Sequence, residues 1–406
     1  MTKSRSSSSS NTQRLTLGGV AGFILVAAVL FAQYGLGIDL LGEEDGDSPA
    51  VVQETSVSGD WYALYFTAPG SAAGESELEQ ALVDAIDGAT VSVDAALFEL
   101  NSDPITQALI RAHNRSGVTV RVVTDGQHGM GINEESPKRK TMPDLVAAGV
   151  SVVSDNTRGG FMHNKFVVID GAAVWTGSTN LTENGIYRNN NNAILIQSTA
   201  LAQNYTAEFE ELYAGEFGKT SPDEMPNPSI VITDQTTGIE TEIETFFESE
   251  GEVSVRLAEL FEDADTVRFM AFSFTDSLKI GDDEDRDLVS LLVSGADAGQ
   301  LDVQGIVENS QRSYLGALIC SDAAQVRRDG NPNTFHHKVF IIDASIVVTG
   351  SFNFSNSADN DNDENILIIH NTEIARAYLD EFDRRWAEAV EVPIGEGENE
   401  ISCPAG

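Results

Sequence analysis

One block of residues occurs twice in this chain, and this repeat constrains the possible folds more than any other feature. The first copy runs from His163 to Asn180 and the second from His336 to Asn353. Both copies read H-x-K-x4-D-x6-G-S-x-N, and the spacing between them is constant, since 336 − 163 = 173 and 353 − 180 = 173. The repeat predicts two similar halves whose copies face each other, an arrangement suited to chemistry that needs two histidines.

Strand and helix signals alternate in the same order in the two halves, which predicts an α/β/α sandwich in each. The first half is expected to contain strands at 61–67, 91–98, 118–124 and 150–153, and helices at 75–87, 103–116 and 143–148. Within the helix at 103–116, Asp103 is the expected cap and Pro104 the first helical residue. The second half is expected to contain helices at 253–263 and 287–294 and strands at 267–274 and 301–307. Equivalent helices at 201–217 and 372–390 close the two halves.

The first 59 residues are expected to lie outside these halves. Residues 1–15 are polar and basic, and residues 16–36 carry no charge and are long enough to span a membrane as one helix. Residues 37–59 read as an acidic linker. Because the basic side chains precede the apolar stretch and the acidic ones follow it, we expect a signal-anchor with a cytoplasmic N-terminus and an extracytoplasmic body. A cleaved signal peptide, which would leave a secreted body, is the alternative.

The remaining boundaries follow from the repeat and from turn-forming residues. They are 60–220 for the first half, 221–240 for the connection, 241–392 for the second half and 393–406 for the tail. The chain has two cysteines, Cys320 and Cys403, and no C-x-x-C pattern, which argues against a cysteine zinc site. In an extracytoplasmic body they are candidates for a disulfide that holds the tail, and otherwise they stay free.

The charge of the chain restricts its partners more than its fold. Lys and Arg total 24 against 64 Asp and Glu, a net charge of −40. Such a surface is typical of a protein that works in high salt, and cation binding is the functional alternative. It repels nucleic acid and anionic membranes, except where salt screens the repulsion to about 3 Å at 1 M.

Each copy of the motif predicts a β-hairpin with its polar groups gathered at one end. On a strand, His163 and Lys165 project from the same face. Asp170-Gly171 is a strong turn signal, whereas the second copy has Asp343-Ala344, so the two hairpins are expected to differ in detail. The candidate catalytic residues are His163, Lys165, Asp170, His336, Lys338 and Asp343. The hydroxyl and amide groups expected to bind a substrate phosphate are those of Ser178, Asn180, Ser351 and Asn353.

Two histidines can divide a displacement at phosphorus between them. One attacks and forms a phosphohistidine, and the other protonates the leaving oxygen and then takes a proton from water. Lys165 and Lys338 already supply positive charge, so no metal and no cofactor are expected. The polar stretch 359–365 lacks the pattern of an EF-hand calcium loop.

The duplicated motif resembles that of the phospholipase D superfamily, and the resemblance covers about residues 60–390. The segments 161–163 and 335–338 resemble the family's approach to the motif. Leu97-Phe98-Glu99 and Ser273-Phe274-Thr275 sit where the family has an aromatic strand near the site. The resemblance implies two halves around a pseudo-twofold axis with the active site between them, and no partner chain is needed to complete it.

The resemblance also implies roles for individual residues. The first-copy histidine, His163, is expected to be the nucleophile, and His336 the general acid. The family often has an acid before an asparagine that supports a histidine, and Glu364-Asn365 fits this pattern. The equivalent positions in the first half, 364 − 173 = 191 and the next, are Asn191 and Asn192, so the acid is missing there. The expected supporting residues are therefore Glu364, Asn365 and Asn192.

Three substrate classes remain open: a phospholipid cleaved to phosphatidate, a nucleic acid, and a phospholipid whose phosphatidyl group passes to an alcohol, as in a cardiolipin-synthase-like transferase. The expected anchor favours lipid, the single span disfavours the transferase, and the net charge disfavours the nuclease.

Tyr187 is a candidate for stacking on a base, and Trp175 is expected in the core. The arginines that are candidates for a positive mouth, or for solvated loops, are Arg158, Arg188, Arg312, Arg327 and Arg328.

Overall fold

The computed structural model describes residues 55–130, 141–156, 158–220, 225–248, 252–395, 397 and 400–403. The predicted cytoplasmic segment, the predicted membrane helix and residues 37–54 of the predicted linker lie outside this part of the chain. Among the described residues, none of the helices has both the length and the apolar character needed to cross a bilayer. The chain divides into two compact units, Met1–Ala50 and Val51–Gly406, and all that follows concerns the second.

The first half is built on an eight-stranded mixed sheet with the strand order β1-β2-β8-β7-β6-β3-β4-β5. Strands β3, β4 and β5 run parallel to one another, and the remaining neighbours are antiparallel. The strands are β1 (Thr55–Ser58), β2 (Tyr62–Phe66), β3 (Ser92–Leu97), β4 (Thr119–Thr124), β5 (Ser151–Ser154), β6 (Lys165–Ile169), β7 (Ala173–Gly177) and β8 (Asn192–Gln197).

The second half repeats this sheet with one strand added at an edge. Its order is β19-β15-β14-β11-β16-β17-β18-β10-β9, which matches the first sheet strand for strand from β15 to β9. These strands are β9 (Ser229–Thr233), β10 (Glu240–Glu248), β11 (Thr266–Ala271), β14 (Asp302–Val307), β15 (Gln325–Arg328), β16 (Lys338–Ile342), β17 (Ile346–Gly350), β18 (Glu364–His370) and β19 (Val390–Glu391). A separate ribbon is formed by β12 (Lys279–Ile280) and β13 (Asp283–Asp287).

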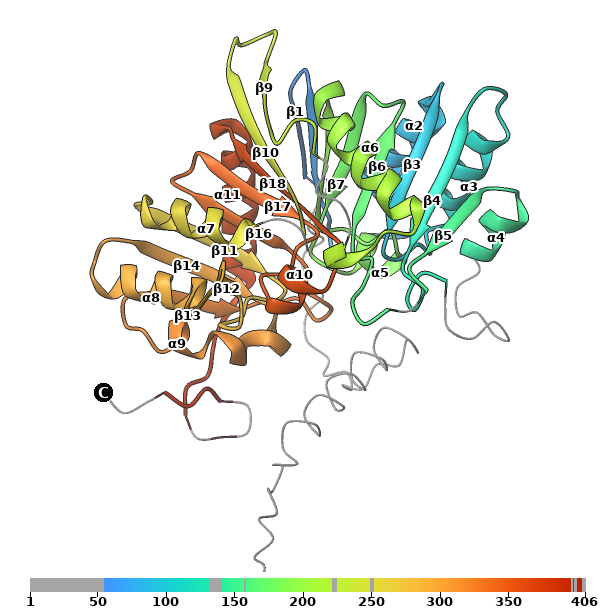
Figure 1. Ribbon diagram of the computed structural model, residues 1–406. Coiled ribbons are helices and arrows are strands. Elements are labelled where there is room, and N and C mark those ends of the chain that lie inside the picture. The colour runs from blue at the N-terminus through green and yellow to red at the C-terminus, as the bar shows by residue number, and fades with distance from the viewer. Residues whose placement is uncertain are drawn as a thin grey trace, which may run out of the picture. The chain divides into compact units, whose positions relative to one another are not determined.

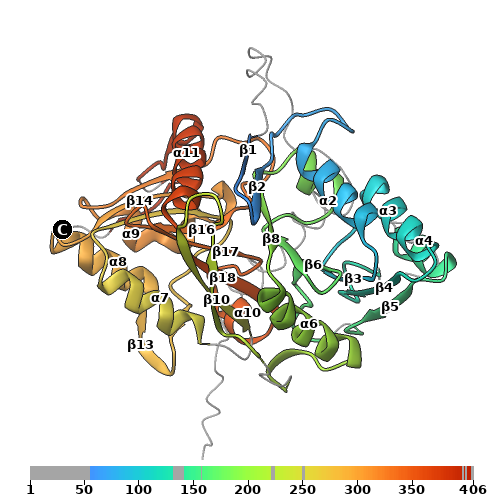
Figure 2. The ribbon, with the colours of Figure 1, turned by 90° about the horizontal axis from the view of Figure 1, so that it is seen from above.

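Helices cover the two sheets in a matching way. Figure 2 shows α2 and α3 at one corner and α7 and α8 at the opposite corner, with α6 and α11 on opposite sides of the centre. The first half contains α2 (Glu77–Gly88), α3 (Asp103–His113), α4 (Thr141–Ala147), α5 (Glu183–Tyr187) and α6 (Thr199–Ala214). The second contains α7 (Val253–Glu262), α8 (Leu288–Asp297), α9 (Gly316–Ile319), α10 (Asn356–Asn360) and α11 (Thr372–Glu388).

Apolar packing joins the halves through a shared core. One buried cluster lies under the outer helices of each half, and a third combines residues of both sheets with α6 and α11. Tyr205 and Phe209 enter this shared cluster from α6, and Tyr378 and Phe382 enter it from α11. Truncating such a buried aromatic ring to alanine typically costs roughly 3–5 kcal/mol, so this core holds the two motif-bearing sheets together.

The structure differs from the sequence-based expectations at several boundaries. Strand β1 lies in the predicted linker, and β9 lies in the predicted connection, where it pairs with β10 in the long hairpin seen in Figure 1. Helix α3 is capped by Ser102, whose side chain accepts a hydrogen bond from the Ile105 amide, and not by Asp103. The predicted tail is tied down by a disulfide between Cys320 and Cys403.

The two motif hairpins turn in the same conformation, so the expectation that they differ is wrong. Asp170 and Gly171 have φ values of 54° and 60°, and Asp343 and Ala344 both have φ of 50°. A left-handed conformation is easy for glycine and costs an alanine about 1–2 kcal/mol. The second hairpin therefore adopts the common turn at the expense of strain at Ala344.

Replacing Ala344 with glycine is expected to stabilise the protein by about 0.5–1 kcal/mol, because relief of the left-handed strain exceeds the entropy that glycine adds to the unfolded chain. Denaturant unfolding midpoints measure the change. The matched variant Gly171→Ala should destabilise the protein by roughly 1 kcal/mol. A destabilising Ala344→Gly would contradict this account of the turn.

Candidate active site

The two copies of the motif meet at the seam between the halves. Each histidine lies two residues before the start of a central strand, β6 or β16, and its backbone is hydrogen-bonded to the opposite half. The His163 amide donates to the Asp363 carbonyl at 3.0 Å, and the His336 amide donates to the Asn190 carbonyl at 2.9 Å. Such reciprocal contacts are those of two halves related by an approximate twofold axis.

His163 is oriented by a carboxylate of the other half. Its Nδ1 lies 2.7 Å from both Oε1 and Oε2 of Glu364. A carboxylate is an acceptor, so Nδ1 carries the proton and Nε2 keeps its lone pair. Burial, followed by the charges of Lys165 and Lys338, lowers the pKa of His163 well below its usual value. Burial raises the pKa of Glu364 to about 7, against the opposing charge of Lys165.

His336 is oriented in the same way by a neutral amide. Its Nδ1 lies 2.9 Å from Asn191 Oδ1 and 3.2 Å from the Ser178 carbonyl oxygen. The carbonyl can only accept, so Nδ1 again carries the proton. Burial and the charge of Lys338 lower the pKa of His336 well below its usual value. The structure therefore pairs one histidine with an acid and the other with an amide.

Asn192, predicted as a supporting residue, lies one position from the group that supports His336. Its Nδ2 is 3.1 Å from His337 Nδ1, and its Oδ1 accepts a hydrogen bond from Thr349 at 2.9 Å. Asn365 makes the equivalent contact from the second half to the first, since its Nδ2 donates a hydrogen bond to Asn164 Oδ1 at 2.8 Å. Both asparagines thus link the halves one layer beneath the histidines, and Asn191 takes the supporting position.

The two motif serines hold the supporting groups. Ser351 Oγ donates to Glu364 Oε2 at 2.6 Å, and Ser178 Oγ donates to Asn191 Oδ1 at 2.8 Å. The glycine before each serine is required sterically, because a Cβ on Gly177 would lie 2.5 Å from the Asn192 carbonyl oxygen. The serine hydroxyls, predicted to bind phosphate, are thus hydrogen-bonded within the protein and position the histidine partners.

The two motif asparagines remain candidates for binding a substrate phosphate. The Oδ1 atoms of Asn180 and Asn353 are buried without a hydrogen-bond partner among the described residues. A buried, unsatisfied oxygen is costly, and because Oδ1 can only accept, a donor such as a hydroxyl or water would satisfy it. The Nδ2 group of each amide is the one that can donate to a phosphate oxygen.

The lysines are buried beside the histidines. Lys165 Nζ donates to the His163 carbonyl at 2.7 Å, and Lys338 Nζ donates to the His336 carbonyl at 3.0 Å. Lys338 Nζ also lies 3.2 Å from His336 Nε2. Burial lowers the pKa of Lys165 to about 7 and that of Lys338 well below its usual value. An incoming phosphate would favour the charged form of both.

The motif aspartates, predicted as catalytic, do not join this cluster. Asp170 and Asp343 follow the far ends of β6 and β16. The Asp170 carboxylate accepts hydrogen bonds from the backbone amides of residues 90–92, and Asp343 accepts from those of residues 265 and 266. We infer a structural role for the two aspartates, because these bonds tie each hairpin turn to the start of the neighbouring strand.

Aromatic rings line the cluster in both halves. Phe98 lies 4.6 Å from the His163 ring, and Phe272 lies 5.0 Å from the His336 ring, measured between centroids. The sequence suggested Phe274 in place of Phe272, but Phe274 is fully buried against Phe340. The repeat spacing changes by one here, since 165 − 98 = 67 and 338 − 272 = 66. The register of each strand against its motif strand is the signal that identifies Phe272.

The arginines expected at a positive mouth are largely engaged within the protein. Arg158 pairs with Asp363 across the seam, and Arg327 pairs with Glu391 at 3.0 Å. Tyr187, a candidate for stacking on a base, is buried and its hydroxyl donates to Glu79. Trp175 is buried in β7, which confirms its prediction as a core residue.

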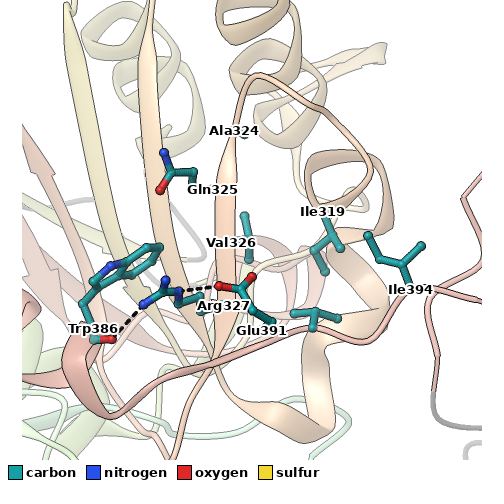
Figure 3. A pocket seen from close by; sticks show the side chains of 9 residues that line it. Ile319, Ala324, Gln325, Val326, Arg327, Trp386, Glu391 and Ile394 are labelled. Carbon is teal, nitrogen blue, oxygen red and sulfur yellow. Dashed lines mark hydrogen bonds and ion pairs between the residues drawn. The ribbon is translucent and has the colours of Figure 1, made fainter.

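A pocket of about 330 Å³ lies away from the motif residues, at the β15 edge of the second sheet (Figure 3). Arg327 crosses it, with its guanidinium 4.2 Å from the centre of the Trp386 ring. The chain segment that continues to the Cys403 disulfide forms one wall through Val392 and Ile394. These contacts account for the pocket as a feature of tail attachment.

Comparison with known proteins finds one matching region in each half of the chain. The family described as "Cardiolipin synthase, PLD-like domain" matches residues 82–213 and 264–386, more than half of the chain and one match in each half. A mitochondrial cardiolipin hydrolase of Xenopus laevis is 36% identical over 126 residues, 31% of this chain and 56% of that protein. A phospholipase D of Rickettsia felis is 48% identical over 59 residues, 14% of this chain and 30% of that protein.

A solved structure extends the likeness over most of the chain. Phosphatidylserine synthase of Haemophilus influenzae has a TM-score of 0.61 at 14% identity and covers 83% of this chain and 89% of its own. At this identity the likeness concerns the fold alone. The chain spans about half the length of the curated relatives that it matches.

Replacing Glu364 with glutamine is expected to lower the pKa of Lys165 below its value of about 7, because the carboxylate charge favours the ammonium form. Titration of ¹³Cε-labelled lysines by NMR measures the shift. Glu388→Gln, on the partly exposed surface of α11, is the matched control and should leave the curve in place. An unchanged or raised lysine pKa in Glu364→Gln would contradict the arrangement.

Proposed function

The chain belongs to the phospholipase D superfamily, and on that premise we propose that it is a phosphodiester hydrolase that acts through a covalent phosphohistidine and removes headgroups from phospholipids. The observation that carries the reaction type is the pair of buried histidines, each held by a group from the opposite half. Both keep Nδ1 protonated, so both present Nε2 to a substrate.

The difference between the two partners assigns the roles. Nε2 of His163 attacks phosphorus, and the imidazolium formed in the intermediate is stabilised by Glu364, 2.7 Å from Nδ1. His336 has only an amide partner, which offers its cation no comparable charge, so it releases a proton readily. When the substrate phosphate binds beside His336, its negative charge favours the imidazolium, so His336 takes up a proton at Nε2. This Nε2–H then protonates the leaving oxygen as the P–O bond breaks. His336 then accepts a proton from water as the water oxygen displaces His163 from phosphorus.

Lys165, Lys338 and the amides of Asn180 and Asn353 complete the proposed site. The ammonium groups offset the charge on the non-reacting phosphoryl oxygens, and the amide groups donate hydrogen bonds to them. This donor set supplies the electrostatic stabilisation from the chain itself, so the proposal includes no cofactor and no metal.

The names of the relatives support a lipid substrate, and the net charge counts against a nucleic acid, although it also repels anionic lipid surfaces. The similar proteins are named cardiolipin hydrolase and phospholipase D. The net charge of −40 opposes approach of a nucleic acid, and Arg158 and Arg327, two of the arginines that would offset it, already pair with carboxylates. We therefore favour a phospholipid over a nucleic acid, and hydrolysis over phosphatidyl transfer.

The disulfide supports a location outside the reducing cytoplasm. Cys320 and Cys403 are bonded across a sequence separation of 83 residues, and such bonds persist mainly in oxidising compartments. We propose that the catalytic body is extracytoplasmic, held by the N-terminal apolar stretch or secreted after its removal, and that one chain forms the whole catalytic unit.

Bis(4-nitrophenyl) phosphate separates the two histidine roles, because its leaving group needs no proton. His336→Ala should release one equivalent of nitrophenolate per enzyme and trap a phosphohistidine, whereas His163→Ala should do neither. Both variants should lose steady-state turnover by at least about 10³-fold, as expected for removal of a nucleophile or its acid–base partner. Rapid mixing and acid-labile labelling measure the burst and the adduct.

His370→Gln is the matched control for this experiment, because His370 lies at the far end of β18 and pairs with Glu244. A burst in His163→Ala but not in His336→Ala would exchange the two roles. Full turnover by either alanine variant would refute the two-histidine mechanism.

The substrate assignment is tested by assaying the full chain on cardiolipin vesicles, phosphatidylcholine vesicles and single-stranded DNA. Headgroup or phosphatidate release should exceed DNA cleavage at salt from about 0.05 to 2 M, and any DNA cleavage should rise with salt as screening relieves the repulsion. A higher kcat/KM on DNA at low salt would identify a nuclease. Phosphatidyl transfer to added glycerol in preference to water would identify a transferase.

A further inference from the structure

Each buried lysine of the site lies over the face of a phenylalanine ring. Lys165 Nζ is 5.0 Å from the centre of the Phe98 ring, and Lys338 Nζ is 5.1 Å from the centre of the Phe272 ring. The two rings occupy matching places, because each directly follows the strand that pairs with the motif strand, β3 beside β6 and β11 beside β16. A cation within about 6 Å of a ring centre is attracted by the electrons of its face.

Glu364, the nearby carboxylate, favours the ammonium form of Lys165 by its charge, but its hydrogen bonds go to other groups. Both carboxylate oxygens of Glu364 lie within hydrogen-bond distance of His163 Nδ1. They also accept hydrogen bonds from Ser351 and Asn362. Each ammonium group instead donates one hydrogen bond to the carbonyl of its own motif histidine. A ring face thus lies within 5.1 Å of each ammonium group, and the two lysines are at most 4% exposed.

A ring face suits this position better than a carboxylate would. A carboxylate would accept hydrogen bonds from the ammonium group and compete with an incoming phosphate. A ring attracts the charge without occupying an N–H bond in the direction of the substrate.

We propose that Phe98 and Phe272 are positioning residues of the active site, whose ring faces keep Lys165 and Lys338 charged and directed at the transferred phosphoryl group. The inference rests on the proposed phosphodiesterase function and deepens it. The titratable and charged groups around each lysine include the other lysine, and the remaining ones are Glu364, Glu99, Asp125, His163 and His336. Glu99 and Asp125 favour the charged form of Lys165, whereas the charge of Lys165 itself opposes that of Lys338. We therefore expect the loss of a ring face to be felt more at Phe272 than at Phe98.

The test replaces each phenylalanine in the full chain with mono-, di- and trifluorophenylalanine, which withdraw electrons from the ring face with little change in shape. For Phe272, kcat/KM on bis(4-nitrophenyl) phosphate should fall stepwise to roughly one tenth, and for Phe98 to roughly one third, in line with the strength of cation–π contacts. The alkaline limb of the pH profile should move to lower pH with each fluorine, because a weaker face favours the neutral amine. A role in histidine packing alone would leave that limb in place.

Phe261 of α7, which packs on Phe340, is the matched control and should give no trend. Phe272→Leu removes the face altogether and should lower kcat/KM by more than the trifluoro variant, with unfolding midpoints recorded to verify the fold. Lysine ¹³Cε titration of the same proteins measures the effect of the ring on the lysine pKa without any substrate.

A flat fluorine series, or an unmoved lysine titration, would overturn the inference. Absence of phosphodiesterase activity in the unmodified chain with a shifted lysine titration would instead count against the proposed function alone.

Discussion

The hydrogen bond between His163 and Glu364 is the interaction on which the rest of the site depends. It joins residues 201 positions apart in the chain, at 2.7 Å and in a buried setting, so it forms only when the two halves are docked. Its counterpart between His336 and Asn191 imposes the same condition from the other side. A half-domain alone would contain a complete motif but would leave its histidine without the group that fixes its tautomer.

The shared core and the crossed asparagine contacts serve this docking. Asn365 forms a hydrogen bond with Asn164, and Asn192 forms one with His337. The layer of residues beneath the catalytic histidines is therefore also hydrogen-bonded between the two halves. Buried polar networks of this kind are costly when incomplete and rigid when complete. The apolar side chains of α6 and α11 supply the burial that offsets this cost. Fold and site are therefore coupled, because the same seam provides both.

Local signals predicted much of this arrangement. The alternation of strand and helix signals placed α2 and α11 to within a few residues of their observed bounds. Strands β1 and β9 were not predicted from the sequence, because they are short, largely exposed edge strands whose pairing depends on distant residues. The left-handed turn at Ala344 was not predicted for a similar reason, because the sheet imposes a backbone conformation that alanine does not favour.

The repeat by itself determined the histidines, the lysines, the duplicated architecture and the class of chemistry, because these depend on residue types at fixed spacing. It also placed an acid in one half and an amide in the other. Only the tertiary structure decided which histidine receives the acid, which protein groups the motif aspartates and serines bind, and which phenylalanine lies beside Lys338. Those outcomes depend on contacts across the seam and on strand register, which spacing along one chain does not encode.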